Sequence, residues 1–426
     1  MRVFRNSDNE GHSTMTTTTS STTSLPTLTS VESLQELVCA AFSREPVDGL
    51  THTFYRYPAR FSPEFARAAI RAFTKPGDVI LDPFMGGGTS IVEARALGRR
   101  AVGMDISALS HFLTQTKAIP LPEKDLLTVE NWITNATRYK LNVRKSLDNE
   151  TEWAQLGYHR NIQGRSTWAI RKILRLAVLS LDELNGPLAK TFARALLLRT
   201  AQWALDCRTD VPTATRFRKQ LLVHFDEMIE GARAYRKAVK AAEVSYDQSL
   251  PRILLLHRSA AGIDKCSSIQ NFGPPKLVLT SPPYPGVHVM YHRWQVLGRK
   301  ETPAPFWIAN VLDGHGLSYY TFGDRHNPGL KSYFRTARNA FESVARLGND
   351  STIFIQMIAF SDPSWQLRAY LETMEASGLI EIRLPQLATE QDGRLWRTVP
   401  NRKWYATKRG QQGAAREVVL LHRRQD

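Results

Sequence analysis

The chain has 426 residues, of which 42% are hydrophobic and 23% are charged, a composition typical of soluble folded proteins. No run of about 18 apolar residues occurs, so a membrane span is not expected. Three cysteines, far apart and without CxxC spacing, argue against a disulfide framework and a structural zinc site, and they favour a reducing, intracellular setting. The net charge of +16 favours polyanionic partners, with nucleic acid as the first candidate.

The chain divides where its composition and pattern change. Residues 1–30 are rich in serine and threonine and poor in large apolar groups, so we expect a disordered tail without the apolar core of a secretory leader. We expect residues 31–120 and 251–426 to form the two parts of one α/β core. Residues 121–250 are expected to form a helical insertion between them.

The first part of the core alternates helices and strands. PEFARAAIRAFTK predicts a helix with Pro63 in its first turn, and DVILDPF predicts a buried strand that ends at Asp82. GGGTSIVEARALGR predicts a glycine turn and a helix, and RAVGMDIS predicts a strand that ends at Asp105. This β–α–β order indicates an α/β fold with a doubly wound, mostly parallel sheet.

The segment 121–250 breaks this alternation. Apolar residues at helical spacing predict helices over TWAIRKILRLAVLSLDEL and TFARALLLRTAQWALD. TRFRKQLLVHFDEMIEGARAYRKAVKAAE predicts one long helix with a narrow apolar seam. Lysine and arginine outnumber aspartate and glutamate here, so the segment is either a packing subdomain with a solvated basic face or a surface that contacts nucleic acid.

Strands resume after residue 250 with PRILLLHRSA, PKLVLTSPPY and STIFIQMIAF. Near the end, LIEIRLPQL and REVVLLHRR flank a basic loop, and we expect them to form an antiparallel pair that closes the sheet. PGVHVMYHRWQVLGR (285–299) is either a lip around a bound base or the start of a packed helix. His288 and His292 lie four residues apart without an evident third ligand, so no metal is expected.

The glycine turn DPFMGGGTS (82–90) follows the first strand, where doubly wound sheets bind their ligands. No lysine follows the glycines, which excludes the phosphate loop of NTPases, and their spacing does not match the dinucleotide fingerprint. S-adenosylmethionine is the remaining common ligand. Asp82 suits its ammonium group, Thr89 its carboxylate near a helix N-terminus, and Asp105 its ribose hydroxyls.

DPFMGGGTS, followed later by TSPPY (280–284), resembles the motifs of the amino-methylating DNA methyltransferases, which modify cytosine N4 or adenine N6. HTFYRYPARFSPEF (52–65) is similar to the segment that closes over the methionine end of the cofactor in that family. The resemblance covers about residues 51–120 and 250–426, and it implies a Rossmann-like class I methyltransferase fold with S-adenosyl-L-methionine as cofactor. The candidate cofactor-binding residues are Phe61, Asp82, Phe84, Gly86, Gly88, Thr89, Asp105 and Ser259.

Two features depart from the family pattern. The third strand of such enzymes often ends in an acid that meets the adenine amino group of the cofactor, whereas LLHRSAAGID offers either Ser259 or Asp264. The insertion falls between the second and third strands, earlier than expected for a target-recognition region.

The loop SPPY supplies the candidate catalytic residues Ser281, Pro282, Pro283 and Tyr284. Two prolines fix two φ angles and remove two backbone donors. The Pro282 carbonyl and the Ser281 hydroxyl are then placed to accept both N–H bonds of an exocyclic amino group and to localise its lone pair. Tyr284 is expected to stack on a base that has left the duplex. In the family, serine at the first position goes mostly with cytosine N4, and aspartate or asparagine mostly with adenine N6.

The sequence therefore predicts a site-specific methyltransferase that modifies N4 of a flipped cytosine in double-stranded DNA. The alternatives are an adenine-N6 DNA or RNA amino-methyltransferase, and a basic DNA-binding module with a catalytically dead core. The enzyme is either solitary or paired with a cognate restriction endonuclease that acts on the same site. Its expected location is the bacterial cytoplasm, in association with the nucleoid.

Overall fold

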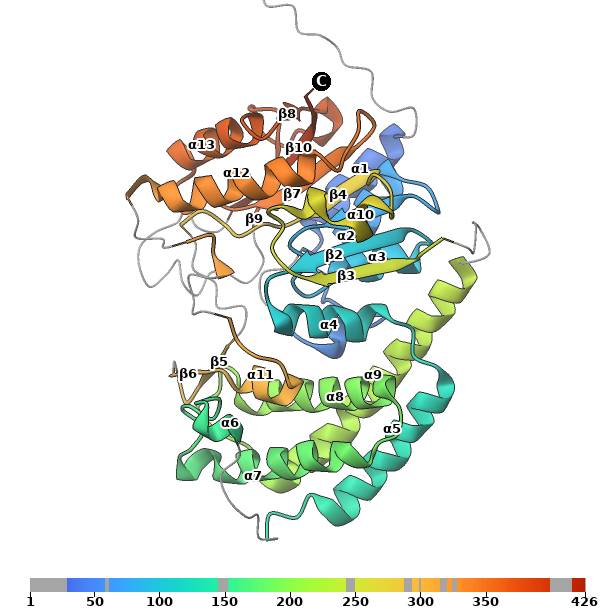
Figure 1. Cartoon of the computed structure of the whole chain (residues 1–426), viewed down its shortest axis with the longest axis vertical. Coiled ribbons are helices and arrows are strands. Elements are labelled where there is room, and N and C mark those ends of the chain that lie inside the picture. Colours follow the sequence, from blue (N-terminus) through green and yellow to red (C-terminus); the bar gives the residue numbers. More distant parts are fainter. Residues whose placement is uncertain are drawn as a thin grey trace, which may run out of the picture.

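The structure is a computed structural model of the chain, and a β-sheet flanked by helices forms one end of it while a bundle of helices forms the other (Figure 1). It describes residues 29–57, 61–144, 152–242, 250–286, 293–298, 300–314, 320–323, 328–398 and 416–425. The predicted disordered tail lies outside these residues except for its last two positions.

The sheet has the strand order β3-β2-β1-β4-β7-β10-β8, and β9 pairs with β10. Its strands are β1 (Val79–Asp82), β2 (Arg100–Asp105), β3 (Ile253–His257), β4 (Leu277–Thr280), β7 (Ile353–Ile358), β8 (Leu379–Ile382), β9 (Leu395–Thr398) and β10 (Arg416–Arg424). The first five strands in the order are parallel, and β10 is antiparallel to β7, β8 and β9. The predicted fold class, a doubly wound and mostly parallel sheet of the class I methyltransferase type with an antiparallel pair, is confirmed.

Helices cover both faces of the sheet, so its central strands are buried on both sides (Figure 1). Alternate residues point to opposite faces: Ile80 and Leu277 join one apolar core, and Leu81 joins the other. The first face is covered by α1 (Val31–Phe42), α2 (Pro63–Phe73) and α3 (Thr89–Ala96), and the second by α10 (Ser267–Gln270), α12 (Lys331–Ala345) and α13 (Pro363–Glu375). Helix α4 (Ala108–Ala118) lies between the sheet and the helical bundle (Figure 1).

The bundle is formed by the segment between β2 and β3. Its main helices are α5 (Glu123–Asn135), α7 (Arg165–Ser180), α8 (Pro187–Leu205) and α9 (Ala214–Ala242). The predicted long helix is α9, which runs unbroken for 29 residues and buries its apolar seam. The shorter helical segments of the chain are η1 (His52–Phe54), η2 (Ala136–Lys140), α6 (Glu152–Gln155), η3 (Leu181–Glu183), η5 (Ile263–Lys265), η7 (Pro328–Leu330) and η8 (Pro385–Leu387).

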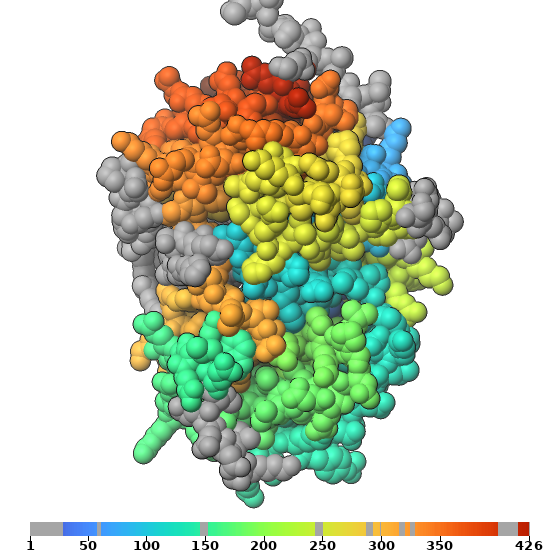
Figure 2. Space-filling model, viewed as in Figure 1, coloured from blue at the N-terminus to red at the C-terminus, as the bar shows by residue number. Residues whose placement is uncertain are grey.

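Residues that follow the proline loop leave the sheet and pack on this bundle. They form β5 (Trp294–Val296), β6 (Lys300–Thr302) and α11 (Ala304–Ala309), and they share one apolar core with α5, α7, α8 and α9. Figure 2 shows this orange segment against the green helices. Within the predicted range 285–299, residues 294–296 therefore form a strand and not a helix, while His288 and His292 lie outside the described residues.

Two negative findings apply to the described part of the chain. None of its helices has the length and apolar character that a membrane crossing requires. It also holds no group of three or more histidine, cysteine, aspartate or glutamate side chains arranged to bind a metal ion.

Candidate active site

The site lies at the carboxyl ends of three neighbouring parallel strands. Strand β1 pairs with β2 on one side and with β4 on the other, so the segments that follow these strands meet at one edge of the sheet. The glycine loop follows β1, and the proline loop follows β4. A cavity of about 480 Å³ opens there, and residues of both loops line it.

Most of the predicted cofactor-binding residues reach this cavity. Those that line it are Phe61, Asp82, Phe84, Gly86, Thr89, Asp105 and Ser259. Gly88 does not line it; it is the N-cap of α3 with φ 75°, and a Cβ there would lie 2.7 Å from the Thr114 hydroxyl. Of the two candidates after β3, Ser259 lies at the cavity, whereas Asp264 pairs with Arg346 at 3.3 Å.

Asp82 ties the two loops together. Its Oδ1 accepts hydrogen bonds from the Thr280 hydroxyl at 2.7 Å and the Phe84 amide at 3.1 Å, and its Oδ2 accepts one from Ser90. Burial raises the pKa of Asp82 to about 6, although these hydrogen bonds oppose the shift. Because Thr280 is the last residue of β4, the carboxylate fixes the start of the proline loop relative to the glycine loop.

Asp105 supports the glycine loop in a similar way. Its Oδ2 accepts a hydrogen bond from the Gly86 amide at 3.0 Å, and its Oδ1 accepts one from the Ser107 amide at 2.8 Å. Burial raises the pKa of Asp105 to about 6. A backbone hydrogen bond from Ile106 also reaches this carboxylate. Of its about four lone-pair positions, one then remains to accept a ligand hydroxyl.

Thr89 is a buried residue whose hydroxyl, in the described part of the chain, is free to bind a polar ligand group. It is the first residue of α3 and is 4% exposed, and within the described structure its Oγ1 has no hydrogen-bond partner. A buried hydroxyl without a partner costs about 1–3 kcal/mol. Because Thr89 lines the cavity at a helix N-terminus, where the helix dipole favours negative charge, it fits a ligand carboxylate.

The proline loop presents some of its side chains to the cavity and buries others. Ser281 and Pro283 line the cavity, and Pro282 and Tyr284 do not. The Pro283 carbonyl accepts a hydrogen bond from the Tyr333 hydroxyl at 2.6 Å, which anchors the loop to α12. Tyr284 is 4% exposed and joins the apolar core under α12 and α13. Stacking of Tyr284 on a base remains a prediction.

Comparisons with known proteins find similarity over the first part of the core. Residues 33–113 match the model of a DNA methylase family, N6_N4_Mtase. The Type II methyltransferase M.MvaI of Kocuria varians is 39% identical over 80 residues, which make up 18% of this chain and 18% of the relative. The Type II methyltransferase M.BsoBI of Geobacillus stearothermophilus is 40% identical over 68 residues, which make up 16% of this chain and 13% of the relative. The predicted resemblance to the amino-methylating DNA methyltransferases is confirmed.

The matches are local. The alignments with M.MvaI and M.BsoBI span less than a fifth of each relative's own length. Among solved structures, the rRNA methyltransferase aviRa of Streptomyces viridochromogenes aligns with 87% of this chain and 89% of its own, with 11% identity and a TM-score of 0.29. The fold assignment therefore rests on the strand order and not on that likeness.

The methyltransferase family and the fold imply S-adenosylmethionine as the cofactor, and the cavity fits it. Among the described residues the Thr89 hydroxyl has no partner, so it suits the cofactor carboxylate, and the remaining lone pair of Asp105 suits a ribose hydroxyl. Gly86 has φ +46°, and a Cβ there would lie 3.1 Å from the Tyr57 ring, so the glycine leaves the loop open where a larger residue would not.

Several residues at the site were missed in the sequence. On α12, Ser332, Arg335 and Thr336 line the cavity, and their i, i+3, i+4 spacing is a polar stripe that sequence reading can detect. Phe322 packs edge-on against Phe84, with ring centroids 5.3 Å apart, but its surroundings carry no regular pattern. Glu417, which accepts a hydrogen bond from Tyr284, lies 133 residues away from it, and no spacing rule links them.

Proposed function

We propose that this protein is an S-adenosylmethionine-dependent DNA methyltransferase that methylates the exocyclic N4 of cytosine. The observation that carries the proposal is the shared cavity, in which Ser281 of the proline loop lies together with Asp105, Gly86 and Thr89 of the cofactor side. S-adenosylmethionine, when bound, supplies a methyl group on a positively charged sulfur. The nucleophile is the amino nitrogen of the base.

The protein's task is to make that nitrogen reactive. Its lone pair is delocalised into the base ring, and acceptors on both N–H bonds localise it. The Ser281 hydroxyl, which lines the cavity, is one proposed acceptor, and the Pro282 carbonyl, from the neighbouring residue that does not itself line it, is the other. The prolines and the bond from Tyr333 to the Pro283 carbonyl keep the loop rigid. Such pre-set acceptor dipoles act without reorganisation during the reaction. The methylated amine then sheds one proton to water, so no strong base is required.

The target amino group is buried inside a duplex, so we infer that the base is extruded into the cavity. The net charge of +16 supports binding to the phosphate backbone. Two exposed arginines, Arg258 and Arg335, line the cavity and suit phosphates beside an extruded base. Ser281, in place of aspartate or asparagine, favours cytosine N4 over adenine N6.

We infer that the helical bundle contacts DNA near the catalytic loop. Residues that follow this loop are bonded to the bundle: the Cys207 amide donates to the Gln295 carbonyl at 2.7 Å, and Arg194 donates to the Ile308 carbonyl at 2.9 Å. These bonds hold the bundle beside the catalytic loop, and DNA at that loop would therefore lie near the bundle. We infer from this that residues 121–250 and 294–309 take part in target binding. The Type II names of the curated relatives support a pairing of this enzyme with a restriction endonuclease.

The test is methylation of plasmid DNA with labelled S-adenosylmethionine, digestion to nucleosides and identification of the product by mass. We expect N4-methylcytosine. N6-methyladenine would overturn the choice of base. If the protein binds the cofactor but the DNA acquires no label, the proposed enzymatic function is overturned. Ser281→Ala serves as the matched variant, since it should retain cofactor binding and lose transfer.

A further inference from the structure

The hydroxyl of Ser281 begins a chain of hydrogen bonds that leads away from the cavity. Its Oγ donates to the Tyr284 hydroxyl at 3.1 Å, and the Tyr284 hydroxyl donates to Glu417 Oε1 at 2.8 Å. Ser281 lines the cavity, whereas Tyr284 is 4% exposed and Glu417 is 3% exposed. The chain therefore runs from the proposed reaction site to a carboxylate in the protein interior.

Glu417 is held in place by groups outside the catalytic loop. It lies on β10 directly opposite Arg397 on β9, and its Oε2 accepts bonds from Arg397 Nε at 2.8 Å and a terminal nitrogen at 2.6 Å. Arg397 is itself buried and also donates to the Ala41 carbonyl at the end of α1. The two carboxylate oxygens thus have separate partners: Arg397 occupies one, and Tyr284 is bonded to the other.

This arrangement fixes the direction of each hydroxyl. A carboxylate can only accept hydrogen bonds, so it draws the Tyr284 hydrogen toward Glu417. The Tyr284 oxygen is then an acceptor for the Ser281 hydrogen. With its only hydrogen directed away from the cavity, Ser281 presents lone pairs alone to any ligand there.

We propose that Glu417 is a positioning residue for the methyl transfer, which orients the Ser281 hydroxyl through Tyr284 as a pure acceptor for the amino group of the base. The proposal rests on the proposed function. No proton moves along this series of hydrogen bonds. The series keeps the Ser281 hydrogen out of the cavity, where that hydrogen would repel the N–H bonds of the base. It also gives the Tyr284 hydroxyl a function separate from any stacking by its ring.

Glu417→Gln tests this direction of bonding because it keeps the shape of the side chain and replaces one acceptor oxygen with a donor N–H₂ group. Two N–H groups of Arg397 require the amide oxygen on their side, so the amide nitrogen must face Tyr284. The Tyr284 hydroxyl then accepts from the amide, its hydrogen turns to Ser281, and the Ser281 hydrogen points into the cavity. Because one of the two acceptors for the amino group is lost, we expect kcat to fall by about 10- to 100-fold, with little change in cofactor affinity or in KM for DNA.

Tyr284→Phe provides the second variant, since it keeps the ring and removes the hydroxyl. We expect kcat to fall, and we expect Glu417→Gln to cause little further loss in the Tyr284→Phe background. A structural role for Glu417 predicts additive losses instead, and a role for the ring alone predicts wild-type turnover in Tyr284→Phe. Either result overturns the proposal.

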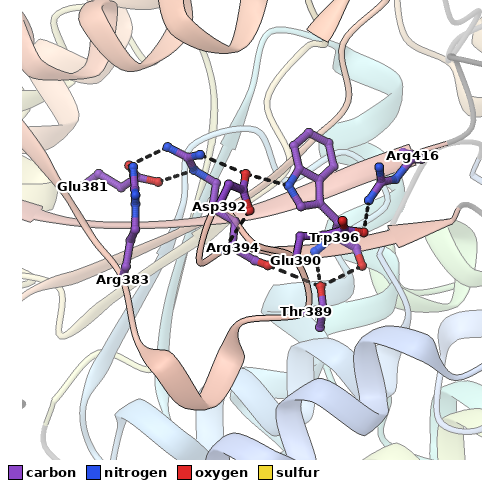
Figure 3. Close-up of polar contacts among 8 residues, drawn as sticks. All are labelled: Glu381, Arg383, Thr389, Glu390, Asp392, Arg394, Trp396 and Arg416. Carbon is purple, nitrogen blue, oxygen red and sulfur yellow. Dashed lines mark hydrogen bonds and ion pairs between the residues drawn. The ribbon is translucent and has the colours of Figure 1, made fainter. Parts of the chain in front are cut away.

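A matched control exists on the same part of the sheet. Figure 3 shows Glu381 on β8, which accepts bonds from Arg394 at 2.7 and 2.9 Å in a cluster of eight residues, none from the catalytic loop. Glu381→Gln also breaks a largely buried arginine–carboxylate pair. Its loss of thermal stability therefore shows how much of the loss in Glu417→Gln comes from breaking such a pair alone. We expect Glu381→Gln to retain wild-type kcat.

The outcomes separate the two proposals. Absence of transfer by the wild-type protein refutes the proposed function. Wild-type kcat in Glu417→Gln, with transfer intact in the wild type, refutes the role of Glu417 alone. Equal losses of kcat in Glu417→Gln and Glu381→Gln, in proportion to the folded fraction, also refute it.

Discussion

The unpartnered hydroxyl of Thr89 gives the sharpest prediction about the cofactor site. Thr89→Val replaces the hydroxyl with a methyl group of nearly the same size. In the ligand-free protein this removes a buried polar atom that has no partner in the part of the chain that the structure describes, a deficit that costs about 1–3 kcal/mol. Threonine and valine have similar helix propensities, so we expect the free energy of unfolding to rise by about 1 kcal/mol.

The same substitution should weaken cofactor binding. A hydrogen bond to a charged group contributes about 1.5–3 kcal/mol, and a tenfold change in affinity corresponds to about 1.4 kcal/mol. We therefore expect the dissociation constant of S-adenosylmethionine to rise about 10- to 100-fold. Urea unfolding of the ligand-free protein and calorimetric titration with the cofactor measure the two effects, which have opposite signs.

Thr280→Val is the matched control in the same site. Thr280 is also fully buried, but its hydroxyl donates to Asp82 at 2.7 Å, so its removal should lower the free energy of unfolding by about 1–3 kcal/mol. The reasoning is refuted if Thr89→Val destabilises the ligand-free protein as Thr280→Val does. Unchanged cofactor affinity in Thr89→Val would refute the assignment of Thr89 to the cofactor.

The remaining predictions concern the cavity and the binding of DNA. Burial raises the pKa of both Asp82 and Asp105 to about 6, so cofactor affinity measured by calorimetry should fall as the pH drops through 6 and both carboxylates take up protons. In the ligand-free protein the raised pKa values lower the free energy of unfolding above pH 6, and this penalty disappears as the pH falls toward 4. Asp105→Asn removes one of the two carboxylates. The urea unfolding midpoint of this variant should therefore depend less on pH over this range than that of the wild type. Gly86→Ala should weaken cofactor binding, because the added Cβ meets Tyr57, while Gly49→Ala, also at positive φ but with open space around it, should leave binding unchanged. DNA affinity, measured by fluorescence anisotropy, should fall steeply with salt, and a flat salt dependence would contradict phosphate contacts.

Local patterns in the sequence predicted the parts of the fold that depend on near neighbours. The glycine loop after β1 and the acid at the end of β2 are readable because a strand, a turn and a helix each leave a short-range signature. The long helix α9 is readable because its apolar seam repeats over 29 residues. Helix α1, which packs on α2 with its N-cap at Ser30, was not predicted, because it directly follows the serine- and threonine-rich segment.

Long-range pairings could not be predicted in this way. The helical bundle takes in β5 and α11 from beyond the proline loop, and only packing reveals that these residues share its apolar core. The bonds of Glu417 join Arg397, 20 residues before it, and Tyr284, 133 residues before it. Sequence spacing describes which residues share a face of one element, whereas hydrogen-bond partners between elements depend on the register of the sheet, here set by β9 and β10.

The central claim is that the cofactor and the amino group of the base meet in one cavity between the glycine loop and the proline loop. A crystal structure of the protein with S-adenosylhomocysteine tests it most directly. We predict a ribose hydroxyl on Asp105, the carboxylate at Thr89, and the sulfur facing Ser281. A cofactor bound elsewhere, or with its sulfur directed away from Ser281, would contradict the claim.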